Sequence, residues 1–226
     1  YLVDGNGLSD TCDGVVAIVD GKRITNKSDP QHWYATCQKA WAAAVASGDY
    51  SHVSIFGFLT DAQQRPVVQP SGDPLPGKAY ITITTLTIPN TPDRVQRHWV
   101  DAVKIPYVVL PTGPFRKSYG VKPGDIAIVY RPKTGAMAVA VSGDCCDLGE
   151  ASIKLHRDLG NEPITNAHRV ARANRGIDDV VFTLVFPGVN VPGSLDAEAW
   201  NQSIRAGGTA ALDKWGGKNR LEACAK

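Results

Sequence analysis

From Val53 onward the hydrophobic residues recur at every second position, and this period constrains the fold more than any other feature of the sequence. Side chains alternate between the two faces of a β-strand, so a period of two predicts strands. Each run is bounded by Gly, Pro, Asp or Asn, which are typical of turns. The predicted strands are Val53–Leu59, Ala79–Ile88, Ile105–Leu110, Asp125–Tyr130, Met137–Gly143 and Asp179–Phe186.

A helix is predicted upstream of these strands. Asp29 is suited to the N-cap, Pro30 to the first helical position, and Gly48 follows the last turn. The apolar residues between them fall four apart, which is typical of one buried helical stripe. They are Trp33, Cys37, Trp41 and Val45.

Other segments complete the predicted topology. The "RPKTGA" turn, with Gly135 free to adopt positive φ, predicts a hairpin between the fourth and fifth strands. A short helix is expected over residues 149–159, and a helical pattern returns near Pro192. We therefore predict a mainly β, α+β fold: a small β-barrel with a packed N-terminal helix and a helical C-terminal extension.

The length of 226 residues favours a single domain. Within it we expect an N-terminal loop and helix over residues 1–52, a β core over residues 53–188, and the helical extension over residues 189–226. We also expect a monomer.

Composition and motifs exclude several functions. The net charge of +2 gives no general attraction to nucleic acid or to an anionic membrane. No run of about 18 apolar residues is present, so no membrane span is predicted. Neither a glycine-rich phosphate loop nor a GxSxG motif occurs, which argues against nucleotide chemistry and serine hydrolysis.

The five cysteines fit no zinc-binding pattern, because no CxxC pair is present. Two disulfides and one free thiol would suit a secreted protein, whereas five reduced thiols would suit a cytosolic one; we expect secretion. Cys12–Cys37 is one candidate bridge, and Cys224 with Cys145 or Cys146 is another. We expect Cys145 and Cys146 to have separate partners, because a bridge between neighbours strains the intervening peptide.

Three carboxylates follow the predicted strand that ends at Gly143, in the segment "GDCCDLGEASIKL". Asp144 comes where the strand ends, Asp147 lies in the loop, and Glu150 comes near the start of a predicted helix. Cleavage of a glycosidic bond needs one protonated and one ionised carboxyl group. An Asp in a turn and a Glu at a helix start are also common structural features, so spacing leaves both interpretations open.

The segment "AVAVSGD" followed by "GEASIKLHRDLG" resembles the fungal-type chitosanases, glycoside hydrolase family 75. Further similar segments follow the same order: "CDG" (Cys12–Gly14), "AYITITTL" (Ala79–Leu86), "WVDAVKIPYVVLP" (Trp99–Pro111), "GVKPGDIAIVY" (Gly120–Tyr130) and "DVVFTLVFPG" (Asp179–Gly188). The strand–hairpin–strand–Asp order also resembles double-psi β-barrel proteins.

The resemblance implies an endo-acting, inverting hydrolase of β-1,4-linked glucosamine polymers that uses one Asp and one Glu. These roles fall on Asp144 and Glu150, with Asp147 as a rival to Asp144 and a further contact for substrate. Glu150 is our choice for the general acid, because apolar neighbours at a helix start can desolvate it. The two roles could be exchanged. The sequence offers no reason to expect a metal or an organic cofactor.

Four further residues are candidate substrate contacts. Asp13 lies within the "CDG" match and Asp10 lies two residues before it; both are suited to a cationic sugar, or alternatively belong to a disulfide-tethered turn. Asp101 could pair with a glucosamine ammonium, or form a turn. Tyr107 could line a sugar subsite, or be a core aromatic.

Two other functions are compatible with the sequence. A peptidoglycan-cleaving lytic enzyme would depend on Asp144 alone. An expansin-like module would bind polysaccharide without hydrolysing it, and would need an exposed planar row of aromatic side chains.

Overall fold

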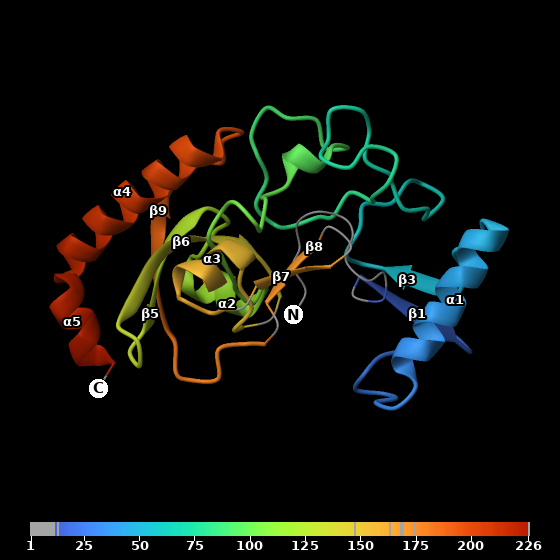
Figure 1. Cartoon of the computed structure of the whole chain (residues 1–226), viewed down its shortest axis with the longest axis horizontal. Helices are drawn as coiled ribbons and strands as arrows, with labels where there is room; N and C mark the ends of the chain where they lie inside the picture. Colours follow the sequence, from blue (N-terminus) through green and yellow to red (C-terminus); the bar gives the residue numbers. More distant parts are fainter. Residues whose placement is uncertain are drawn as a thin grey trace.

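The computed structural model describes residue 12 and residues 14–146, 148–162, 164–167, 170–173 and 175–225. In this part of the chain the fold is α+β (Figure 1). The strands are β1 (Val15–Val19), β2 (Lys22–Ile24), β3 (Val53–Ile55), β4 (Tyr107–Val109), β5 (Asp125–Arg131), β6 (Ala136–Asp144), β7 (Ile164–Ala167), β8 (Val170–Ala173) and β9 (Phe182–Asn190). The helices are α1 (Trp33–Ser47), α2 (Pro114–Tyr119), α3 (Ile153–Asp158), α4 (Ala197–Trp215) and α5 (Gly217–Cys224), with a 3-10 turn at Gln96–His98.

The N-terminal elements form a small unit at one end of the molecule (Figure 1). Its sheet has the order β2-β1-β3, and α1 packs against it. Val15 and Cys37 are fully buried in its core, beside the nearly buried Phe58. A disulfide joins Cys12 to Cys37 over a Cα–Cα distance of 5.9 Å, so this expected bridge is confirmed.

The larger sheet has the order β4-β6-β5-β9. β4 runs parallel to β6, whereas β5 is antiparallel to both β6 and β9. The expected hairpin is confirmed, because Gly135 has φ 72° in the turn between β5 and β6. β7 and β8 form a separate two-stranded ribbon.

Both faces of the larger sheet are covered. On one face, Ile126 and Val141 pack with Ile204 of α4, which approaches so closely that a Cβ on Gly208 would lie 2.1 Å from Val139 Cγ1. On the other face, Ala127 packs with Leu155 of α3. The central strand β5 is buried on both faces and is correspondingly apolar on both sides over Ile126–Val129.

The alternating run Ala79–Ile88 is extended but does not form a strand. Ile81, Leu86 and Ile88 are buried, but the buried positions change from odd to even numbers at Thr82, so the alternation is interrupted within the run. It is paired only at isolated bridges, for example between Tyr80 and Val68. The strand prediction is therefore wrong here, because no continuous neighbouring strand accepts its hydrogen bonds.

Two other boundaries differ from the prediction. Asp29 Oδ1 accepts a hydrogen bond from His32 N at 3.1 Å, so Asp29 closes a turn and α1 begins only at Trp33. β3 pairs with β1, so this strand belongs with the N-terminal unit rather than with the β core that was expected from residue 53.

The sheets of the described residues are open, and the closed barrel that the sequence predicted is not observed among them. No helix in this part of the chain has the length and apolar character needed to cross a bilayer.

Candidate active site

Asp144 is the last residue of β6 and is 6% exposed. Its Oδ1 accepts hydrogen bonds from Cys145 N at 2.8 Å and Thr85 N at 3.0 Å. Its main-chain oxygen accepts from Leu110 N at 3.1 Å. In the described part of the chain, no group donates to Oδ2. The carboxylate is therefore oriented by the two backbone N–H groups that donate to Oδ1.

A β-bulge precedes Asp144. Val108 is paired with Ser142 and Val109 with Asp144, so Gly143 is an extra residue in β6. Gly143 lies against the ring of Tyr107, and a Cβ at this position would lie 2.4 Å from Tyr107 Cγ. Bulges re-aim side chains and are frequent beside active sites. The glycine thus permits both the bulge and the close approach of β6 to Tyr107.

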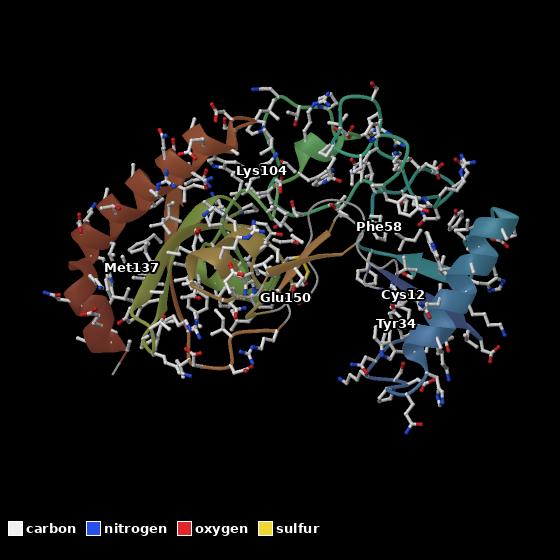
Figure 2. The ribbon with its side chains drawn as sticks, viewed as in Figure 1. Cys12, Tyr34, Phe58, Lys104, Met137 and Glu150 are labelled. Atoms are coloured by element: carbon white, nitrogen blue, oxygen red, sulfur yellow. A yellow bond between two sulfur atoms is a disulfide. The ribbon has the colours of Figure 1, made fainter. Side chains whose placement is uncertain are left out.

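Glu150, labelled in Figure 2, is half-buried, and the segment that holds it pairs with the edge of β4 opposite to β6, through the bridge between Val108 and Ala151. Its main-chain oxygen accepts a hydrogen bond from Val109 N at 3.0 Å. Ser152 then caps α3, with its hydroxyl accepting from Leu155 N at 3.2 Å. α3 begins at Ile153, so Glu150 precedes the helix and does not lie in its first turn, as the helix expected over residues 149–159 had implied.

Asp144 and Glu150 are thus held by adjacent residues of one strand, Leu110 and Val109. Successive N–H groups of an extended strand point to opposite sides, so the two backbones flank β4. Two strand spacings correspond to about 9.5 Å. The carboxyl groups of inverting glycosidases are about 6.5–9.5 Å apart, so the main-chain placement is compatible with such a pair.

Glu150 borders a cavity of about 730 Å³ between β4, β5, β9 and α3. Most of its lining is apolar, and the ionisable side chains in it are Glu150, His156 and Asp179. Asp144 does not line this cavity. The full lining is Val108, Val109, Leu110, Phe115, Val129, Leu148, Gly149, Glu150, Ala151, Leu155, His156, Leu159, Gly176, Ile177, Asp179, Val181, Thr183 and Val185.

Two polar groups of this cavity have well-defined partners. His156 Nδ1 lies 2.8 Å from Asn161 Nδ2, so the amide donates and the ring nitrogen accepts. Burial lowers the pKa of His156 below its usual value, which favours the neutral ring. Arg131 donates two hydrogen bonds to Asp179, at 2.7 and 2.8 Å, and these lower the pKa of that carboxyl group.

Arg116 of α2 lies beside Asp144. Its Nη2 donates to the main-chain oxygen of Asp144 at 2.9 Å and to Thr85 Oγ1 at 3.4 Å, while its Nε is buried without a partner. Burial lowers the pKa of Arg116, and the negative charge of Asp144 opposes that shift. Sequence reasoning missed Arg116 and Thr85, because they lie 28 and 59 residues from Asp144 and belong to no motif.

Within the part of the chain that the structure describes, the other residues that were expected to contact substrate are not brought together with Asp144 and Glu150 in one cavity. Tyr107 is 2% exposed in the main core, which favours its structural interpretation. Asp101 Oδ1 accepts from Val103 N at 2.9 Å and its Oδ2 pairs with Lys104, so it closes a turn. It borders a separate cavity of about 100 Å³ beside Trp200. Asp10, Asp13 and Asp147 lie outside the described residues.

The disulfide prediction for the later cysteines is wrong. Cys145 and Cys146 are bonded to each other, and Cys224 is exposed and free. The peptide between Cys145 and Cys146 is cis, which brings their Cα atoms to 3.2 Å and their sulfurs within bonding reach. Cys224 ends α5 on the outer side of the larger sheet, at the end of the molecule opposite α1 (Figure 1).

No cluster of three or more His, Cys, Asp or Glu side chains suited to a metal ion occurs within the described ranges.

No protein-family model matches the chain, and no curated protein matches it significantly.

Proposed function

We propose that this chain is a secreted glycoside hydrolase that cleaves β-1,4 bonds of an amino-sugar polymer, with chitosan as the first candidate. The observation that carries the proposal is the attachment of Asp144 and Glu150 to the two sides of β4 through Leu110 and Val109. The two disulfides are compatible with an oxidising compartment.

In the proposed reaction Glu150 is the general acid. It borders the mostly apolar cavity and, in its protonated form, donates a proton to the leaving glycosidic oxygen. Asp144 is the base: backbone N–H groups hold Oδ1, and Oδ2 takes a proton from the attacking water. The water attacks the anomeric carbon from the face opposite the leaving group, and the configuration inverts.

The double-psi-like barrel, the single catalytic domain and the monomeric state form part of the same proposal. The parallel β4–β6 pair, with β5 antiparallel to β6, is compatible with that barrel topology.

One observation favours a second candidate, a lytic enzyme that acts on peptidoglycan with a single carboxylate. Asp144 is absent from the lining of the cavity that Glu150 borders. If the two carboxylates do not face the same substrate-binding cleft, Asp144 alone would catalyse the reaction and Glu150 would be dispensable.

The test is a reducing-end and mass-spectrometric assay on soluble chitosan and on purified peptidoglycan. We expect Asp144→Asn and Glu150→Gln each to lower turnover on chitosan by about two to four orders of magnitude, the usual contribution of a general acid or base. Glu222→Gln, the same change on α5, is the matched control and should keep full activity.

Proton NMR of the first products adds a stereochemical test. An initial α-anomer from the β-linked substrate supports inversion, whereas an initial β-anomer contradicts it. Near-full chitosan activity in Asp144→Asn or Glu150→Gln would contradict the assignment. Anhydro-sugar products that depend on Asp144 but not on Glu150 would instead establish the lytic enzyme.

A further inference from the structure

Arg116 brings a positive charge to the immediate neighbourhood of Asp144. Its guanidinium is anchored by Nη2, which donates to the main-chain oxygen of Asp144 and to Thr85 Oγ1. Thr85 in turn donates its N–H to Asp144 Oδ1, so one residue holds both the carboxylate and the guanidinium. The position of the charge is therefore fixed relative to the candidate base.

The guanidinium keeps unused donors. Nη1 has no partner in the described part of the chain and, unlike Nε, is not among the buried unpaired atoms. An arginine donates in a fixed plane and remains charged at all working pH values. Nη1 can therefore donate to a ligand group that lies beside Asp144.

The charge balance at this point discriminates between two sugars. An ionised Asp144 by itself would attract the ammonium of glucosamine. Arg116 offsets that charge and, at short range, repels a second cation. An N-acetylated sugar carries no charge, and its carbonyl oxygen can accept from the guanidinium.

We propose that Arg116 makes the ring that lies against Asp144 an N-acetylated sugar rather than free glucosamine. This inference rests on the proposed function, in which Asp144 takes part in catalysis. It adds to the proposed function which substituent, an acetamido group, the sugar beside Asp144 carries. The acetamido group occurs both in partially acetylated chitosan and in peptidoglycan, so both polymers belong in the test.

The first measurement is the identity of the sugars at the new chain ends, determined by mass-spectrometric sequencing of products from half-acetylated chitosan. We expect the wild type to place an acetylated unit at the same one of the two new ends in nearly all cleavages, whereas random cleavage would place it there in about half. We also expect a higher kcat/KM on half-acetylated than on fully deacetylated chitosan. Peptidoglycan, assayed in parallel, shows which polymer supplies the acetylated unit.

Variants at position 116 then test the cause. Arg116→Gln removes the charge and should reduce the ratio of kcat/KM on half-acetylated to deacetylated chitosan about tenfold, because one short-range charge interaction is lost. Arg116→Lys keeps the charge and should keep most of the preference for half-acetylated over deacetylated chitosan. Lys117→Gln, the same loss of charge at the exposed neighbouring position of α2, is the control and should leave the ratio unchanged.

A binding measurement does not depend on turnover. Calorimetry with the Glu150→Gln protein should show tighter binding of the N-acetylglucosamine tetramer than of the glucosamine tetramer. Equal binding, glucosamine at both new ends, or an unchanged ratio in Arg116→Gln would each overturn the role of Arg116 while an active enzyme upholds the proposed function. Inactivity on every polymer would defeat the proposed function itself.

Discussion

At the scale of single residues, Gly143 links the core to the candidate base. It lies directly against Tyr107, which is 2% exposed, and it is the extra residue of the bulge before Asp144. The alternation of the sequence predicted where the strand ends, and so placed Asp144 correctly at the end of β6. No local pattern indicated that a neighbouring strand would bring an aromatic ring onto the glycine.

Gly143→Ala should therefore destabilise the protein by about 1–3 kcal/mol, the usual cost of inserting a methyl group where there is no space. The added Cβ would lie 2.4 Å from Tyr107 Cγ. Urea unfolding measures the change. Gly176→Ala is the control, because a Cβ there meets no atom within 4 Å. Equal stability of Gly143→Ala and the wild type would show that β6 can shift away from Tyr107.

At the scale of elements, Arg131 and Asp179 connect the end of β5 to the segment that leads into β9. The pair is bidentate, and its hydrogen bonds lower the pKa of Asp179 from the usual 3.8. Because the folded pKa lies below the unfolded one, the pair stabilises the fold above about pH 3.8. That contribution to stability is lost as the pH falls through the lowered pKa that Asp179 has in the folded protein.

Asp179→Asn should consequently be less stable than the wild type at pH 7, and the difference should shrink as the pH falls below 3.8. Chemical unfolding at a series of pH values measures it. Asp178→Asn removes the same charge one residue earlier and should show a smaller difference at pH 7. A difference between Asp179→Asn and the wild type that stays constant down to pH 2 would contradict a stabilising role for the ionised pair.

At the scale of the whole molecule, the N-terminal unit has its own core and its own disulfide. The bridge between Cys12 and Cys37 spans a sequence separation of 25 residues and ties the start of β1 to α1. In the chain-entropy account, a loop of this size contributes about 3 kcal/mol. The helices α4 and α5 pack on the other end, against the larger sheet (Figure 1).

Replacing both cysteines, Cys12→Ser with Cys37→Ser, should destabilise the N-terminal unit selectively. Hydrogen exchange should accelerate in β1, α1 and β3, whereas β5 and β6 should keep most of their protection, because different cores hold them. Cys224→Ser, which removes the free thiol, is the control. An equal loss of protection in β5 and β6 would show that the two parts unfold as one unit.

The sequence alone determined the local structure of the central hairpin of the larger sheet. The two-residue hydrophobic period and the turn residues predicted β5, β6 and their hairpin. Both signals depend only on residues close together in the chain, namely the alternation of side chains along a strand and the positive φ of Gly135 in the turn. They also placed Asp144 at a strand end and predicted a helix after it, although α3 begins at Ile153, a few residues later than expected.

Only the tertiary structure decided which segments meet. Ala79–Ile88 has a strand's alternation over most of its length but lacks a continuous partner, because pairing depends on a second segment far along the chain. β4 lies between Asp144 and Glu150 for the same reason. Arg116 and Thr85 reach Asp144 through contacts over tens of residues, and contacts at that separation leave no periodic signal in a single sequence.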